Sequence, residues 1–172
     1  MGYAGGTKVS PTYHDLGDHT EVFEVGYDPT RISFERLLVE FWDGHSPSED
    51  MWSRQYRSAI FVANDSEREA AERSVLLAEK RLGRGVHTAV EDTGPFWQAE
   101  DYHQKYRLRR DGAVWKQLQA AYPDVDDLVR STAAARLNAW VSGSGGGAQL
   151  EQELPTVGLN AEAQERLLRR HR

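Results

Sequence analysis

The sequence predicts an α/β (α+β) fold, because strand-like segments alternate with amphipathic helical segments along its first two thirds. Residues 20–25, TEVFEV, alternate polar and apolar side chains, as a half-buried strand does. Two further strand-like segments, 58–63 and 86–91, flank a long helical segment that ends at Gly83. These three observations favour a sheet with helices packed against it.

The elements before residue 50 are marked by turn and cap residues. Residues 2–7, GYAGGT, are typical of a glycine-rich turn. After a break at Asp28-Pro29, Ser33 is the expected N-cap of a helix that Gly44 ends. Its apolar side chains recur at helical spacing on one face: Phe34, Leu37, Leu38, Phe41 and Trp42.

The middle of the chain predicts a buried strand and a second helix. Residues 58–63, SAIFVA, show little polar alternation, which is typical of a central strand. Ser66 and Glu69 form a capping-box pattern that predicts where the second helix begins. A short helical segment is expected at 99–108.

The composition changes near residue 111, which predicts an α/β domain over 1–110 and a helical C-terminal extension over 111–172. Helical patterns lie around 113–121, 126–141 and 160–170. Residues 142–147, SGSGGG, are expected to be a flexible break between the last two.

The composition excludes several classes of protein. The 172 residues carry a net charge of −6 with basic residues spread along the chain, which argues against nucleic-acid binding. No segment approaches the roughly 18 apolar residues of a membrane span, and no signal-peptide pattern opens the chain, so a cytoplasmic location is expected. Without cysteine, these residues cannot perform thiol chemistry. His14 and His19 are weak candidates for metal ligands, and no bound cofactor is expected.

Five motifs occur in a fixed order over the first two thirds of the chain: GYAGG at 2–6, PTY at 11–13, GDHTE at 17–21, QYRSAIF at 55–61 and GPFWQAEDYHQ at 94–104. In order and spacing they resemble the A-type methionine sulfoxide reductases. The resemblance implies a two-layer mixed-sheet α/β sandwich. It also implies thiol-dependent reduction of methionine S-sulfoxide, free or in proteins, as repair of oxidative damage.

The chemistry of sulfoxide reduction explains which side chains such a site needs. The sulfoxide oxygen leaves only when it is protonated or strongly hydrogen-bonded, so an acid and phenolic donors must face it. By resemblance, Glu21 corresponds to the acid, and burial beside apolar residues would keep it protonated. Tyr13 and Tyr56 correspond to the two phenols. Taken alone, a tyrosine in such a position is more often packed in the core with its hydroxyl hydrogen-bonded, and a glutamate that opens a strand is more often solvated than catalytic.

Three weaker candidates for the substrate site complete the set. By resemblance, Tyr102 in AEDYHQ corresponds to a further residue near the nucleophile. Trp52 is a candidate for the wall of the pocket, although a tryptophan packed on its own domain fits the sequence as well. Asp50 lies one position from the place where many family members have an aspartate.

The chain departs from the family at the nucleophile. In the family the nucleophile is a cysteine in a GCFWG motif upstream of GYAGG, and an external thiol reductant of the thioredoxin type or dithiothreitol regenerates it. This chain has no cysteine and is predicted not to turn over. One hypothesis is that the true start lies upstream of Met1, which the upstream DNA would test. The alternative is a non-catalytic relative that binds sulfoxide or has a structural role. Thiol-free acid–base chemistry on another substrate has no supporting feature.

Overall fold

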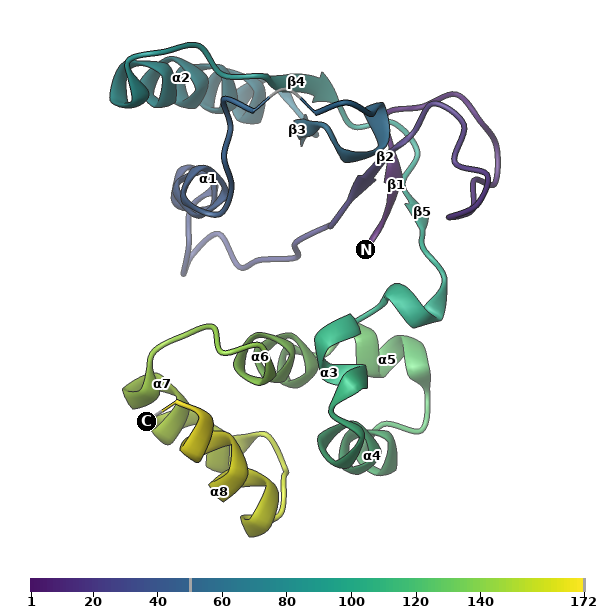
Figure 1. Ribbon diagram of the computed structural model, residues 1–172, viewed down its shortest axis with the longest axis vertical. Helices are drawn as coiled ribbons and strands as arrows, with labels where there is room; N and C mark the ends of the chain where they lie inside the picture. The colour runs from purple at the N-terminus through teal and green to yellow at the C-terminus, as the bar shows by residue number, and fades with distance from the viewer. Residues whose placement is uncertain (50, 172) are drawn as a thin grey trace. The chain divides into compact units, whose positions relative to one another are not determined.

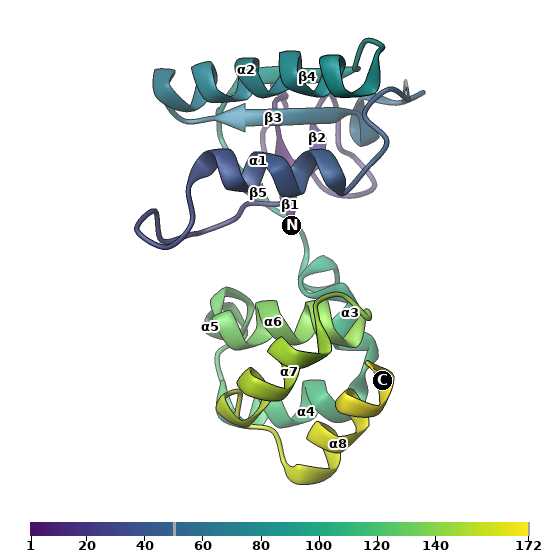
Figure 2. The ribbon, with the colours of Figure 1, turned by 90° about the vertical axis from the view of Figure 1, so that its left-hand side faces the viewer.

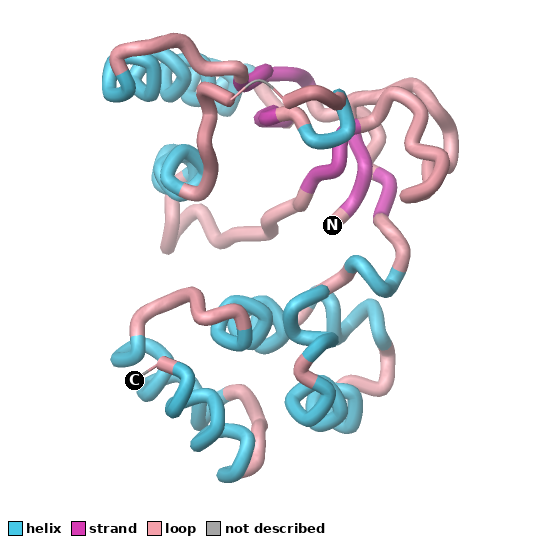
Figure 3. Tube along the Cα trace, viewed as in Figure 1, coloured by secondary structure: helices cyan, strands magenta, loops and turns pink. Residues whose placement is uncertain are grey.

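The computed structural model describes residues 1–49 and 51–171, and the chain divides into two compact units, Met1–Glu100 and Asp101–Arg172. Figure 1 labels the elements, and Figure 3 shows that the strands belong to the first unit and that the second is built of helices. Each unit has apolar clusters of its own. The α/β fold class is therefore confirmed.

A three-stranded antiparallel sheet with the order β2-β1-β5 forms one part of the first unit. Its strands are β1 (Gly2–Ala4), β2 (Thr20–Val22) and β5 (Trp97–Gln98). The expectation of a turn over residues 2–7 was wrong for the first three of them. Tyr3 is only 2% exposed, and burial of this large ring holds the segment as the central strand. The turn follows at Gly5, where φ is +74°.

A parallel pair, β3 (Ser58–Val62) with β4 (Thr88–Asp92), forms the second sheet of this unit. The helices α1 (Phe34–Asp43) and α2 (Asp65–Leu82) lie on the same side of this pair (Figures 1 and 2). Their shared core consists of Leu38, Trp42, Ile60, Val62, Ala70, Ala71 and Ala78. The prediction of β3 as a central strand was wrong, because among the described residues it pairs with β4 alone. Its apolar character comes from the helices that cover one face.

The helix caps agree with the sequence except at the start of α2. Ser33 accepts a hydrogen bond from the backbone N–H of Arg36, and Gly44 follows α1 as expected. The N-cap of α2 is Asn64 rather than Ser66. Its side chain accepts from Glu67 N, while Glu67 Oε2 accepts from the N–H of Ala63, the residue before the cap, so the cap lies two residues earlier than predicted. Gly83, at φ +66°, ends α2 as predicted.

The second unit packs short helices around a leucine-rich core. The helices are α3 (Tyr106–Arg110), α4 (Gly112–Ala121), α5 (Val125–Arg130), α6 (Thr132–Val141), α7 (Gly147–Glu153) and α8 (Ala161–Arg170). Three short 3₁₀ segments complete the described elements: η1 (Arg54–Tyr56), η2 (Asp101–His103) and η3 (Leu154–Thr156).

One helical pattern predicted for this unit is divided in the structure. The helical pattern over 126–141 is divided at Ser131, whose hydroxyl caps α6 by accepting from Ala134 N. The Gly/Ser stretch 142–147 connects the end of α6 to the start of α7. The expected domain boundary at 110/111 falls between α3 and α4. In the described part of the chain, no helix combines the length and apolarity needed to cross a membrane.

Candidate active site

The candidate site begins at β2, whose register fixes the position of Glu21. Glu21 pairs with Tyr3, which in turn pairs with Trp97 of β5. Residues that pair directly across antiparallel strands share one face of the sheet, so these three side chains are neighbours. Tyr3 also forms a buried cluster with Leu16 and Ala99, against which Trp97 packs.

Tyr13 is held against this sheet by Glu100. The buried Tyr3 hydroxyl donates to Glu100 Oε2 at 2.6 Å, and Glu100 Oε1 accepts from Tyr13 N at 3.0 Å. The ring of Tyr13 packs against the cluster around Tyr3. One carboxylate therefore fixes the backbone of a predicted site residue to a buried side chain of the central strand.

The loop before Glu21 is fixed by Asp18 and His19, which sequence reasoning had not placed. The Asp18 carboxylate accepts from the backbone N–H and hydroxyl of Thr7 and from Lys8 N, which lowers its pKa to about 2. The ring of His19, 1% exposed, accepts from Gly6 N and donates to the carbonyl of Lys8. Both residues thus have structural partners. Over the described ranges, no group of three His, Asp or Glu side chains is placed to hold a metal ion.

Two arginines bring η1 against β2. Arg54 donates to the carbonyl oxygens of Asp18 at 2.7 Å and Gly5 at 2.8 Å. Thr20 Oγ1 donates to the carbonyl of Arg54 and accepts from Arg57 Nε at 2.9 Å. These contacts position the two residues between the arginines, Gln55 and Tyr56, beside Glu21.

Glu21 and Tyr56 meet at the amide of Gln55, and Tyr13 joins them through Tyr56. Gln55 Nε2 donates to Glu21 Oε1 at 2.5 Å and to the Tyr56 hydroxyl at 3.1 Å. The pKa of Tyr56 is raised, first by a hydrogen bond with the Tyr13 side chain, then by desolvation and by the charges of Tyr13 and Glu21. Tyr56 is 39% exposed, whereas Glu21 and Tyr13 are half-buried. The result is a cluster of one carboxyl, two phenols and one amide that is open to solvent.

The three weaker candidates are placed differently. Trp52 is 86% exposed, with its ring centroid 6.0 Å from that of Tyr56. Asp50 lies outside the described residues. Tyr102 lies in η2 of the second unit and is 52% exposed, and its role near the nucleophile stays a prediction.

Sequence reasoning missed Gln55 and Glu100, although both lie inside the recognised motifs. Gln55 directly precedes Tyr56 in QYRSAIF, and Glu100 directly follows Ala99 in AEDYHQ. Neither residue type carries a chemical signal at its position. Only the folded chain shows that each joins segments 34 or more residues apart.

The fold and this cluster together define a class of protein: an α/β domain in which a carboxyl, two phenols and an amide gather at a solvent-open site. A family model described as "Peptide methionine sulfoxide reductase" matches residues 1–135. Because that match covers most of the sequence, the chain belongs to the peptide methionine sulfoxide reductase family.

Individual relatives agree with this assignment. The chain is 39% identical over 161 residues to a "Peptide methionine sulfoxide reductase" of Drosophila melanogaster, a match that covers 92% of this chain and 64% of the relative. It is 38% identical over 148 residues to "Peptide methionine sulfoxide reductase A5" of Oryza sativa subsp. japonica, covering 83% of this chain and 58% of that protein. A Methanoculleus marisnigri protein named "Peptide methionine sulfoxide reductase MsrA" is 40% identical over 131 residues, 67% of this chain and 79% of the relative. The chain thus spans about three fifths of the length of the first two.

Proposed function

We propose that the cluster of Glu21, Tyr13 and Tyr56 binds the oxygen of methionine S-sulfoxide in a thiol-dependent reductase. The observation that carries the proposal is the Gln55 amide, which contacts both Glu21 and Tyr56 while Tyr13 hydrogen-bonds to Tyr56. In this proposal the three side chains face the oxygen of the bound sulfoxide. Methionine sulfoxide, free or in a protein, presents such an oxygen on a small apolar side chain.

The reaction assigns a distinct task to each group. A thiolate attacks the sulfoxide sulfur, the S–O bond breaks, and the attacking sulfur becomes a sulfenic acid. A second thiol converts the sulfenic acid to a disulfide and releases water, so that two thiols are oxidised for each sulfoxide reduced. Tyr13 and Tyr56 donate hydrogen bonds to the sulfoxide oxygen. Glu21 supplies the proton that this oxygen takes up as negative charge develops on it.

The nucleophilic thiol must come from outside these 172 residues, because they contain no cysteine. In this proposal the electrons come from an external thiol of the thioredoxin or dithiothreitol type. The second candidate function, a non-catalytic relative that binds sulfoxide, rests on the same missing cysteine. Both candidates require sulfoxide binding at the cluster, and only turnover distinguishes them.

Binding is tested by titrating the 172-residue chain with L-methionine S-sulfoxide, followed by NMR, with methionine as the control ligand. We expect chemical-shift changes near Glu21 that methionine does not cause. Tyr56→Phe and Glu21→Gln should each weaken binding about tenfold, the effect of one lost hydrogen bond of roughly 1.4 kcal/mol. The matched controls Tyr27→Phe and Glu24→Gln should bind as the unmodified chain does. Equal weakening in both pairs of variants would show that the cluster does not bind the sulfoxide.

Turnover is tested separately with dithiothreitol as the reductant. The 172-residue chain should give no methionine, and product above background would contradict the requirement for a cysteine. In a longer form that carries a GCFWG segment, we expect activity, with Glu21→Gln lowering the rate on the order of 10²–10⁴-fold. Sulfoxide binding by that longer form without turnover would favour the non-catalytic alternative.

A further inference from the structure

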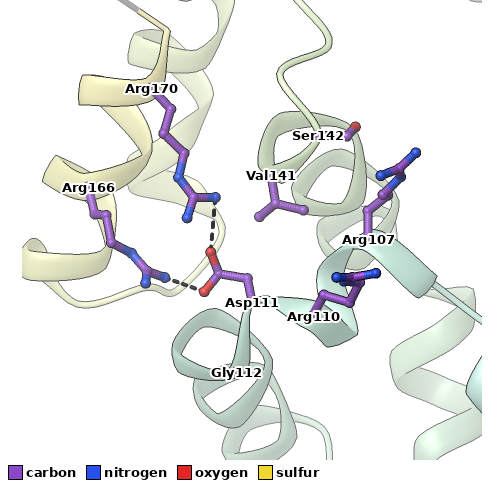
Figure 4. A pocket seen from close by; sticks show the side chains of 8 residues that line it. All are labelled: Arg107, Arg110, Asp111, Gly112, Val141, Ser142, Arg166 and Arg170. Carbon is purple, nitrogen blue, oxygen red and sulfur yellow. Dashed lines mark hydrogen bonds and ion pairs between the residues drawn. The ribbon is translucent and has the colours of Figure 1, made fainter.

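The second unit contains a cavity of about 380 Å³ whose lining is dominated by arginine (Figure 4). Arg107, Arg110, Arg166 and Arg170 line it, together with the single acidic residue Asp111. Val141 is the one large apolar side chain in the lining. Since guanidinium groups stay protonated at any physiological pH, the local charge is about +3.

The fold brings these arginines together from distant parts of the unit. Arg107 and Arg110 belong to α3, and Arg166 and Arg170 stand four residues apart on one face of α8. Figure 4 shows the α8 pair approaching Asp111 from one side and the α3 pair on the other. Asp111 binds Arg166, contacts Arg170 at 3.1 Å, and caps α4 by accepting from Val114 N.

The positive charge of this cavity exceeds what the fold neutralises. Asp111 is the one carboxylate in the lining, and it is shared by two arginines whose side chains remain 41% and 43% exposed. Arg110 donates to the hydroxyl of Tyr106, which is neutral. Within the described residues, no carboxylate partner is found for Arg107. Like charges held together cost stability, so an arrangement of this kind is typical of an anion site.

The charge also contrasts with the rest of the chain. The whole sequence is acidic, at −6, yet residues 101–172 hold eleven Lys and Arg against nine Asp and Glu. Four of these eleven basic residues line this cavity. Arg166 and Arg170 also lie beyond residues 1–135, the part of the chain that the family model matches. The cavity therefore combines arginines of the matched region, Arg107 and Arg110, with two that lie beyond it.

We propose that this cavity binds a small, multiply charged phosphate, either inorganic diphosphate or a compact phosphate ester. Guanidinium groups form paired hydrogen bonds to phosphate oxygens, and several of them suit a ligand with more than one negative charge. A volume of about 380 Å³ is at the small end of ligand pockets. Because the lining holds no aromatic ring on which a base could stack, the ligand is hydrophilic throughout.

The test is calorimetric titration of the whole 172-residue chain with inorganic diphosphate. We expect binding that weakens as sodium chloride is raised, because salt screens the exposed arginines. The double variant Arg107→Gln/Arg110→Gln removes the two arginines that Asp111 does not engage, and should weaken binding at least about tenfold. The control Arg169→Gln removes an arginine of the same helix whose partner is Glu165, outside the cavity, and should change the Kd less than about twofold. No binding, or equal weakening by both variants, would overturn the proposal.

A second variant separates ligand binding from structural loss. Asn is as good an N-cap as Asp, so Asp111→Asn keeps the cap of α4 while it removes the competing carboxylate. We expect tighter diphosphate binding in a chain whose circular dichroism is unchanged, and weaker binding by that folded variant would refute the site. Vesicles of phosphatidylcholine with phosphatidic acid test a lipid headgroup as the phosphate source. Binding to these vesicles without binding to diphosphate would contradict a small ligand.

Discussion

Arg57 joins the two small sheets of the first unit, and replacing it with glutamine should loosen both. Its Nε donates to Thr20 Oγ1 on β2 at 2.9 Å. Its two terminal nitrogens donate to the carboxylate of Glu91 on β4 at 2.5 and 2.6 Å. The side chain thus forms one hydrogen bond to a neutral hydroxyl and one bidentate ion pair. Without it, Glu91 keeps its charge but loses the cation that faces it.

The size of the effect follows from the exposure of the pair. Hydrogen bonds to charged groups contribute about 1.5–3 kcal/mol when desolvated, whereas exposed ion pairs contribute about 0–1 kcal/mol. The side chains of Arg57 and Glu91 are 18% and 32% exposed, so the pair is intermediate between a desolvated and a fully exposed one. The ion pair should contribute about 1–2 kcal/mol and the hydrogen bond to Thr20 about 1 kcal/mol more, so we expect Arg57→Gln to lower the free energy of unfolding of the first unit by about 2–3 kcal/mol at pH 7.

The effect should also depend on pH, with a sign that the structure fixes. Hydrogen bonding to Arg57 lowers the pKa of Glu91 in the folded state. A lowered pKa contributes stability above the unfolded value and loses it as the pH falls through the folded value. The difference between the unmodified chain and Arg57→Gln should therefore be largest near pH 7 and shrink below about pH 4.

Hydrogen exchange measured by mass spectrometry tests this prediction one unit at a time. Peptides that cover β3 and β4 should exchange faster in Arg57→Gln, while peptides from α6 in the second unit serve as an internal reference. The control Arg84→Gln removes an exposed arginine and should change the free energy by less than about 0.5 kcal/mol. Unchanged protection of β3, or a loss of equal size at pH 7 and pH 3.5, would refute the reasoning.

Two further predictions concern separate parts of the chain. Leu137→Ala removes a side chain that is 0% exposed in the leucine core of the second unit, and should lower the free energy of unfolding of that unit, measured by hydrogen exchange of its peptides, by about 2–5 kcal/mol. The control Leu76→Ala, at a site 66% exposed, should change the free energy of unfolding little. Similar losses in both variants would show that the core is misassigned. The pKa of Asp18 is lowered to about 2, mainly by hydrogen bonds from Thr7. The loop that contains Thr7 and Lys8 should therefore stay fixed to Asp18 above about pH 4, and should be released as the pH falls from 3.8 through about 2. Asp18→Asn should abolish that acid transition in hydrogen exchange of residues 5–8, and a transition that persists would assign it to another group.

Local sequence patterns predicted the helices of the first unit well. Ser33 and Gly44 bound α1, and Gly83 ends α2, because caps depend on the backbone geometry of a few adjacent residues. The start of α2 was misplaced by two residues. Asn64/Glu67 and Ser66/Glu69 both fit the capping-box spacing, and the end of β3 at Val62 favours the earlier pair.

Strand pairing was less predictable, because it depends on residues far away in the chain. Residues 2–4 resemble a turn, yet they form the central strand of a sheet whose neighbours come from residues 20–22 and 97–98. The apolar run at 58–62 predicted a central strand, but a helical layer on one face accounts for the same pattern. A short apolar segment does not specify how many neighbours it has.

By itself, the sequence determined the family, through motifs in a fixed order, and the chemical inventory, through the complete absence of cysteine. It also predicted Glu21, Tyr13 and Tyr56 as members of one candidate site. Tertiary structure alone decided that Gln55 lies between Glu21 and Tyr56, that Glu100 holds Tyr13, and that four arginines from α3 and α8 line one cavity. The physical reason is that a residue's type and its local spacing limit what it can do, whereas hydrogen bonds and charges act over a few ångströms and depend on which distant segments the packed core brings into contact.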